Sequence, residues 1–397
     1  MKPMKIIISV LLILFFTAQL FSQTATLNKK QAKTIEITRE ELYDKLYGGW
    51  VGMLIGGLEG LPYEWKFYDE PRESLPDFNF LPNGARTDDD NDFELTHLYF
   101  MDREGILKLP YERIAQIWKT NMRTGIWAAN KRARVLMDSL GMIPPATGSY
   151  ENNPIGHFNL SAQFCTEAYG MISPGMPKTA ADIGIYYAHI SVCCEPIQAA
   201  QYWTSLISIN MVESLSTEDL LRKALQSVDQ NSVMHELVED AIQAYHNNPN
   251  DWKAARQLIY NKWLKEKKWN ANSTPTNGGM VILSLLYGNG DFYKTLQYAM
   301  AFGIDADCNA ATAGVIVGTK VGFTGISKLP GFAMPDHFVN KTRPQLPAEM
   351  KISEQAELLM RVCEKVILEN GGKKIKIKGK DGYQIKLQNP VIQEYLK

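Results

Sequence analysis

Residues 303–322 read GIDADCNAATAGVIVGTKVG, and this stretch governs how the chain around it can pack. Acidic residues open it, and small residues then recur at every fourth position, namely Ala310, Gly314, Gly318 and Gly322. A spacing of four places them on one face of a helix. A glycine inside a helix costs up to about 1 kcal/mol relative to alanine. We therefore expect a compensating feature, the close approach of another backbone element to this face.

A second stretch with the same spacing lies early in the chain. Residues 48–60 read GGWVGMLIGGLEG, with glycine at positions 48, 52, 56 and 60. The pattern Thr38-Arg39-Glu40-Glu41 is a capping box that predicts a helix starting after Thr38. This helix does not resemble a membrane span, because Glu59, Glu64 and Lys66 end the apolar run early.

The rest of the chain reads as mainly helical. Residues 23–36 are expected to be a loose lead-in, and residues 66–86 a loop. Apolar periodicity predicts amphipathic helices at 111–124, 180–190, 197–212, 217–228, 231–246, 281–286 and 292–302. Near the end, 375–377 and 383–387 alternate in polarity around Lys380-Asp381-Gly382, which indicates a hairpin. The sequence thus predicts an all-α, compact multi-helix bundle over 23–370, with a small β-hairpin appendage in 371–397.

Composition limits the functional classes. The 397 residues are 45% hydrophobic with a formal net charge of -1, which gives no electrostatic footprint for nucleic acid. Lys2 and Lys5 precede an apolar run at 6–21, so residues 1–22 are expected to be a cleaved signal peptide. The mature protein would then be periplasmic or secreted and free of the membrane. Five cysteines allow one disulfide that the sequence does not identify, although Cys193 and Cys194 are adjacent and not expected to bridge each other.

Two acidic clusters, TDDDND at 87–92 and DADCN at 305–309, each open a helical stretch. An acidic triplet alone is usually a solvated turn with a helix cap. An EF-hand is excluded, because Phe93 and Tyr99 stand where that loop needs glycine and glutamate. The small residues that follow Asp307 place the second cluster near the core, where uncompensated charge is costly. If the fold brings the clusters together, a pair of hard divalent cations is the simplest reason for them.

Several motifs, taken in order, resemble the ADP-ribosylglycohydrolase family. GGLEGLPYE at 56–64 is similar to that family's GDxxGxxxE signature, and TDDDND to its Asp-Asp-Thr motif. GIDADCNAA at 303–311 is similar to its Asp-x-Asp-Thr motif. QFCTEAYG at 163–170, Pro174-Gly175, LLYG at 285–288 and Gly290-Asp291-Phe292 also fit. The resemblance covers about residues 40–325.

The resemblance implies a two-magnesium site between the acidic segments, with Mn²⁺ as an alternative ion. The metal ligands carried over are Asp88, Asp89, Asp90, Asp305, Asp307 and, at a threonine position, Cys308. Glu64 would lie near the scissile sugar, and Asp89 or Asp90 would orient or deprotonate the attacking water. The first motif aligns either as Asp88-Asp89, with Thr87 as a ligand, or as Asp89-Asp90, the alignment we prefer.

Two departures from the family pattern are Gly57, where the signature has aspartate, and Cys308, whose thiol is a poor ligand for Mg²⁺. Further candidates for substrate binding are Gln163, Glu167 and His189, and Trp50, Tyr63, Trp65 and Phe93 are candidates for stacking. We expect hydrolysis at the anomeric carbon of a small or protein-linked ribosyl substrate. The alternatives are a glycosidase for a different sugar and a non-catalytic binding protein on the same fold. The sequence predicts nothing about oligomeric state.

Overall fold

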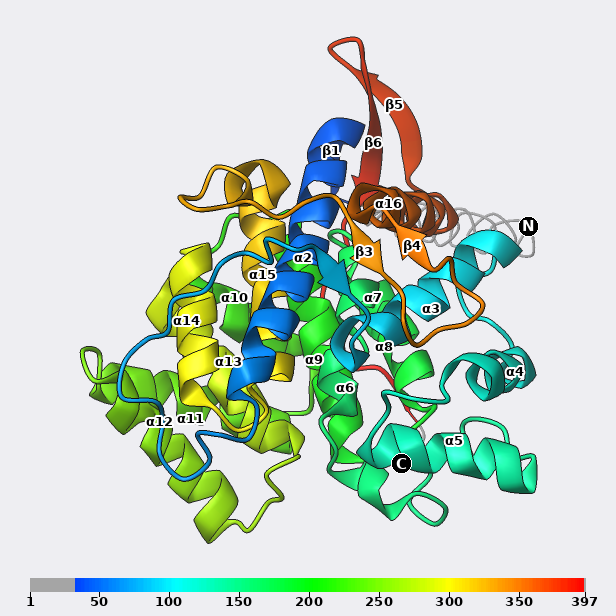
Figure 1. Ribbon diagram of the computed structural model, residues 1–397. Helices are drawn as coiled ribbons and strands as arrows, with labels where there is room; N and C mark the ends of the chain where they lie inside the picture. Colours follow the sequence, from blue (N-terminus) through cyan, green and yellow to red (C-terminus); the bar gives the residue numbers. More distant parts are fainter. Residues whose placement is uncertain (1–32, 396–397) are drawn as a thin grey trace, which may run out of the picture.

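A computed structural model describes residues 33–395, and its centre is a pair of helices built from the two glycine-spaced stretches. These are α2 (Arg39–Gly60) and α15 (Ala306–Ile326), which lie side by side in Figure 1. A methyl group on Gly48 would lie 2.5 Å from the carbonyl oxygen of Gly318, and one on Gly60 2.6 Å from Cα of Asp307. A methyl group on Gly52 or Gly56 would overlap the α15 backbone. The predicted close approach is confirmed, and each stretch is the other's partner.

The ends of this pair follow the expected local rules. The Thr38 hydroxyl accepts a hydrogen bond of 3.1 Å from the Glu41 amide, so the predicted cap of α2 is confirmed. α15 contains a break at Gly322, whose φ of 71° is favourable for glycine. The acidic residues lie at the N-terminal end of α15, where Asp305 is the N-cap and Asp307 is in the first turn.

Other helices surround the α2–α15 pair and bury an extensive apolar core. No predicted helix range corresponds to α5, α6, α7, α12 or α16, and α13 starts at Thr274 instead of Val281. The surrounding helices are α3 (Asp89–Glu104), α4 (Tyr111–Asn121), α5 (Ala128–Leu140), α6 (Ser161–Phe164), α7 (Glu167–Met171), α8 (Pro177–Ala188), α9 (Glu195–Asn210), α10 (Thr217–Ala224), α11 (Val233–Asn247), α12 (Trp252–Tyr260), α13 (Thr274–Gly288), α14 (Phe292–Phe302) and α16 (Ile352–Glu369). Short helical turns are η1 (Leu61–Tyr63), η2 (Pro154–His157), η3 (Leu225–Ser227) and η4 (Asn261–Glu266).

The C-terminal hairpin is present but differs from the prediction in two ways. Its strands are β5 (Lys373–Ile377) and β6 (Lys380–Lys386), and the turn lies at Lys378-Gly379, both with positive φ. Lys380-Asp381-Gly382 therefore belongs to a strand, because the chain reverses where the left-handed residues lie. β1 (Thr34–Thr38) pairs antiparallel with β6, so part of the expected loose lead-in is a strand.

A second sheet connects chain segments that are distant in sequence. β2 (Ala85–Arg86) runs parallel to β3 (Phe338–Val339), which pairs antiparallel with β4 (Glu349–Met350). This sheet brings residues 340–343 against the start of α3. Strands of two residues are too short to produce an alternating pattern, so the sequence did not predict them.

The remaining expectations concern the signal peptide, the domain boundaries, a membrane span and the cysteines. The predicted signal peptide lies outside the described residues, and the boundaries near 22 and 370 stay predictions. Across residues 33–395, no helix combines the length and apolarity that a membrane crossing requires. All five cysteines lie in that range as free thiols, with the Sγ atoms of Cys193 and Cys194 2.9 Å apart.

Candidate active site

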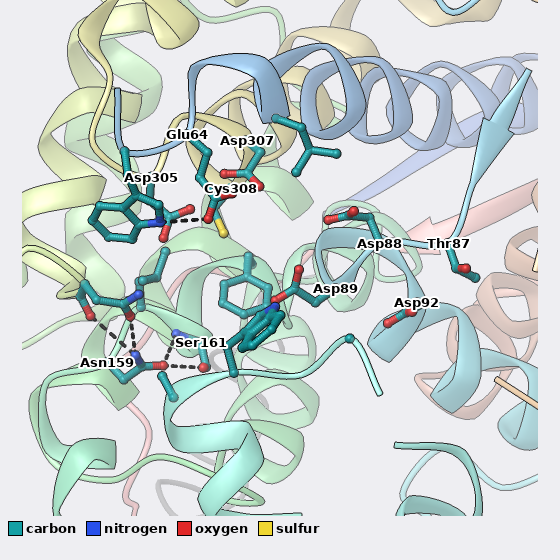
Figure 2. A pocket seen from close by; sticks show the side chains of 18 of the residues that line it. Glu64, Thr87, Asp88, Asp89, Asp92, Asn159, Ser161, Asp305, Asp307 and Cys308 are labelled. Atoms are coloured by element: carbon teal, nitrogen blue, oxygen red, sulfur yellow. Dashed lines mark hydrogen bonds between the residues drawn. The ribbon is translucent and has the colours of Figure 1, made fainter. Parts of the chain in front are cut away.

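A cavity of about 540 Å³ lies where three chain segments meet (Figure 2). The first segment follows η1 and contributes Glu64 and Trp65. The start of α3 with the two residues before it contributes a second set, and the start of α15 with its N-cap contributes a third. The cavity-lining residues from these two sets are Thr87, Asp88, Asp89, Asp92, Asp305, Asp307 and Cys308. The two acidic clusters, far apart in sequence, therefore face one space.

Backbone hydrogen bonds hold the first and third segments together. The Trp65 amide donates to the Ile304 carbonyl at 2.7 Å, and the Ile304 amide donates to the Phe67 carbonyl at 3.1 Å. Gly303 has a φ of 73°, and any side chain there would overlap Phe67. This ladder fixes Glu64 next to Asp305, so the glycine before the acidic cluster is needed for the close approach.

The second segment is held by the β2–β3–β4 sheet. The Thr87 amide donates to the Val339 carbonyl at 3.0 Å, and the Thr87 hydroxyl accepts from the Lys341 amide at 2.9 Å. Asp88 is the N-cap of α3, and the side chain of Asn91 accepts from the Asp88 amide at 3.4 Å. Thr87 is therefore a structural anchor whose hydroxyl is already bonded.

Two groups of potential metal ligands share Asp307. In one, Glu64, Asp305 and Asp307 each offer an oxygen, and the three atoms lie within 4.8 Å of one another. In the other, Asp90, Asp307 and Cys308 offer two oxygens and a sulfur within the same limit. The first group lines the cavity. In the second, Asp90 is almost wholly buried behind Cys308.

The carboxylates of the site have few compensating charges. Buried oxygens without a hydrogen-bond partner occur on Asp88, Asp90, Asp305 and Asp307. Among the described residues only Arg86 forms an ion pair with these acids, to Asp88 at 3.4 Å. Burial, and then repulsion by neighbouring carboxylates, raises the pKa of Asp89, Asp90 and Asp307 well above the usual range. Burial and Asp305 likewise raise the pKa of Glu64.

Asp92 is the exception among the acids at the start of α3. Its Oδ1 lies 2.6 Å from Nη2 of Arg343, and its Oδ2 accepts a hydrogen bond of 2.8 Å from the Thr342 hydroxyl. Both Asp92 and Arg343 are buried. Burial still raises the pKa of Asp92 to about 6, because desolvation outweighs the attraction of Arg343. Asp92 is thus a buried, paired structural acid. Among the described residues Asp89 and Asp90 have no ion-pair partner, and Asp88 has only the 3.4 Å contact with Arg86.

A family model described as ADP-ribosylglycohydrolase matches residues 38–366, most of the chain. The chain belongs to the ADP-ribosylglycohydrolase family. Among solved structures, it resembles a chain titled "ADP-ribosylglycohydrolase-related protein complex" with a TM-score of 0.53 and 15% identity. That match covers 82% of this chain and 99% of the other, and at this identity it shows the fold alone. No curated protein matches the sequence directly. The predicted family and the mostly helical fold are confirmed.

Within this ADP-ribosylglycohydrolase fold, the predicted metal ligands meet but are not equivalent. Asp88 and Asp89 line the cavity, whereas Asp90 lies behind it against Gly57. Asp88 and Asp89 are the aligned pair in one alignment of the first motif, and Asp89 and Asp90 in the other. Which alignment holds stays a prediction.

The three predicted substrate-binding residues do not line the cavity. Gln163 donates to Asn309 and Thr312, each at 3.3 Å, and Glu167 accepts from the Thr312 hydroxyl at 2.7 Å. Both are buried behind the start of α15. His189 follows α8, and its buried Nε2 has no hydrogen-bond partner. A substrate contact for any of them stays a prediction.

Of the predicted stacking residues, only Trp65 lines the cavity. Its indole donates to Glu64 at 2.7 Å, and 38% of the residue is exposed. Trp50 is buried and donates to Gln355 at 2.7 Å, while Phe93 is buried beneath the Arg343 guanidinium. Trp50 and Phe93 therefore pack in the core.

Sequence reasoning missed one wall of the ADP-ribosylglycohydrolase cavity. Asn159, Ser161 and Asn272 form a hydrogen-bonded group there (Figure 2), in which Asn159 accepts from the Ser161 amide at 3.1 Å. Trp127 also lines the cavity and is 64% exposed. None of them stands in a recognisable motif. The exposure of Trp127 is the clearest signal, and it is visible only in the folded chain.

Proposed function

We propose that this protein hydrolyses the glycosidic bond at the anomeric carbon of ADP-ribose or a related ribosyl or pentofuranosyl conjugate. One observation carries the proposal. Unpaired, largely buried carboxylates converge from three segments on one cavity, in a chain that belongs to a glycohydrolase family. Buried charge without compensation is strongly unfavourable. Bound cations would stabilise such a site by compensating its charge.

The residues present fit divalent cations, since partnerless oxygens lie within ligand distance of one another. Asp305 and Asp307 would hold one ion through oxygen, as Mg²⁺ or Mn²⁺ prefers, with Glu64 beside them. Asp88 and Asp89 complete the acidic rim on the opposite side (Figure 2). Bound cations would supply charge compensation, fix the sugar hydroxyls and lower the pKa of a nearby water.

The protein's own side chains divide the remaining work. Asp89 faces the cavity and would accept the proton of the attacking water as general base. Glu64 has a raised pKa and would hold a proton near the scissile oxygen, with its carboxyl oriented by the Trp65 indole. Trp65 and Trp127 would pack against the sugar or its aglycone and exclude water.

The cellular setting is part of the same proposal. A secreted or periplasmic enzyme would meet free or polymer-linked pentosides and ribosylated proteins outside the cytoplasm. The partner would be a small or protein-linked ribosyl substrate, with no nucleic acid and no membrane involved.

The test is sugar release by the purified mature protein, with Mg²⁺ and with chelator. Substrates are an ADP-ribosylated arginine and a panel of pentofuranosides. We expect metal-dependent cleavage that Asp305→Asn abolishes and Glu70→Gln, a change at an exposed acid away from the cavity, leaves intact.

The outcomes separate three functions. Cleavage of the ADP-ribosyl bond supports the activity that the family name implies. Cleavage of a simple furanoside alone identifies a glycosidase for another sugar. Absence of turnover on every substrate, in folded protein with metal bound, overturns the hydrolase proposal in favour of a binding protein.

A further inference from the structure

We infer that Asp90, Asp307 and Cys308 form an inner cation subsite with one sulfur ligand, and that this subsite takes Zn²⁺ in preference to Mg²⁺. The inference rests on the proposed function only for the presence of cations between α3 and α15. Its test reads metal identity instead of turnover. Hence either proposal can fail while the other stands.

Geometry is the first support. One ligand atom from each of Asp90, Asp307 and Cys308 lies within 4.8 Å of the other two. Zn²⁺ bonds oxygen at about 2.0–2.2 Å and sulfur at about 2.3 Å, so small side-chain adjustments would close such a triangle around one ion. All three residues lie in the first turns of α3 and α15, whose positions are fixed by the packing of α15 on α2 and by the β2–β3 sheet.

Unsatisfied polar atoms are the second, independent support. Both carboxylate oxygens of Asp90 are buried and without a hydrogen-bond partner, and so is Oδ1 of Asp307. Asp90 is 1% exposed and Asp307 3% exposed. Among residues 33–395, neither forms an ion pair, and no arginine or lysine compensates them. A cation at this position would give one oxygen of each carboxylate a partner.

Gly57 explains how a carboxylate reaches this depth. An added methyl group at Gly57 would lie 3.3 Å from Oδ2 and 3.4 Å from Cβ of Asp90. The missing side chain on α2 thus leaves the space that Asp90 of α3 fills. Gly57 and Cys308 are the two positions at which the sequence departs from the family pattern, and both lie next to the buried Asp90.

Ligand chemistry decides the preference. Glu64, Asp305 and Asp307 present only oxygen, which suits Mg²⁺ or Mn²⁺. A thiolate is a poor ligand for those ions and a strong one for Zn²⁺. When Zn²⁺ binds, the Cys308 S–H bond breaks, the sulfur keeps the electron pair and donates it to the ion, and the proton leaves to solvent. Cys308 lines the cavity, so that proton has a path out. Asp307 belongs to both groups of ligands, so it would contribute to the oxygen subsite and to the sulfur-containing one.

The experiment uses metal-free mature protein, dialysed against Zn²⁺ with excess Mg²⁺ and then analysed for elements. We expect one Zn²⁺ per chain, retained against Mg²⁺. Co²⁺ in place of Zn²⁺ should produce the near-ultraviolet absorption of a thiolate–cobalt bond. Cys308→Thr should remove that absorption and weaken Zn²⁺ binding at least about tenfold, a change of about 1.4 kcal/mol. Circular dichroism checks that each variant is folded.

Matched variants establish whether Cys308 itself supplies the sulfur ligand. Cys194→Ser, which changes a partly exposed thiol outside this cluster, should retain the absorption and the bound Zn²⁺. Asp90→Asn should lower Zn²⁺ affinity without removing the sulfur signal. Displacement of Zn²⁺ by Mg²⁺ in folded wild-type protein overturns the inference. So does a cobalt absorption that persists in Cys308→Thr and disappears in Cys165→Ser.

Discussion

The α2–α15 pair has two dissimilar ends. At Gly48, Gly52 and Gly56 of α2, the two backbones are in direct contact, with no charged side chain among the nearest atoms. At the end near Gly60, the same two helices carry the acids of the cavity, several of them buried without partners. The glycine region is tightly packed, backbone against backbone, whereas the acidic region contains buried carboxylate oxygens that lack hydrogen-bond partners.

The difference teaches how the site is held in place. Backbone contact leaves little freedom for α15 to slide or rotate on α2, because interiors are densely packed and small shifts cause overlap. Asp305 and Asp307 therefore stay near Glu64 despite their mutual repulsion. The favourable packing of the glycine-rich region offsets the unfavourable free energy of the buried carboxylates in the acidic region.

The largest expected effect concerns Asp92, the acid at the start of α3 whose ion pair is fully buried. Arg343→Met leaves Asp92 buried and uncompensated, which should lower the free energy of unfolding by about 3–5 kcal/mol. Denaturant titration measures this loss. The double variant Asp92→Leu/Arg343→Met should recover part of it, because no buried charge remains. A loss below about 1 kcal/mol for the single variant would show that Asp92 does not need a partner.

The glycine contact can be broken directly. Gly56→Ala places a methyl group on the backbone at Ala310, so we expect a loss of about 3 kcal/mol in unfolding free energy, the upper part of the usual range for overpacking. The matched control is Gly49→Ala on the same helix. Its methyl group meets the side-chain ends of Thr319 and Met171, which can move, and the loss should be clearly smaller. Equal losses would mean that backbone contact is not what holds the pair.

The acids behind the cavity predict a pH dependence of stability. Burial raises the pKa of Glu167 to about 8, and Glu167 repels the buried Glu94. Between about pH 4.5 and 8 the folded chain keeps a proton that the unfolded chain loses. Stability should therefore fall as pH rises through this window, and Glu167 alone should contribute at most about 1.4 kcal/mol per pH unit to the slope. Denaturation midpoints across the window measure the slope.

Glu167→Gln is the matching variant for this pH dependence. The amide cannot ionise, so the slope should be shallower than in the wild type. An unchanged slope would assign the pH dependence to other groups.

The smallest expected effect tests the acidic end itself. In chelator, Asp305→Asn removes one charge from a crowded set and should raise stability by about 1 kcal/mol. With Mg²⁺ present, the wild type should gain stability and the variant much less. Thermal melts with and without metal give both numbers. If Asp305→Asn lowers the stability in chelator, the Asp305 carboxylate does not destabilise the metal-free fold.

Local patterns in the sequence predicted a large part of this structure. Thr38 capped its helix as expected, and a spacing of four between small residues anticipated close backbone contact. Both signals lie within a few residues of what they predict. β1 was missed because its partner, β6, lies about 350 residues away, although its own sequence, TIEIT at 34–38, alternates in polarity. Arg343 was missed because nothing near it in the chain indicates that it faces Asp92.

The sequence by itself therefore determined the family, the helical class and the set of acids, because these depend on local periodicity and on motifs. Tertiary structure alone decided which acid does what. It paired Asp92 with Arg343, left Asp88 and Asp89 on the cavity and buried Asp90 against Gly57. The physical reason is that the pairing and pKa of a carboxyl group depend on the charges and solvent around it. Those surroundings come from segments that only the folded chain brings together.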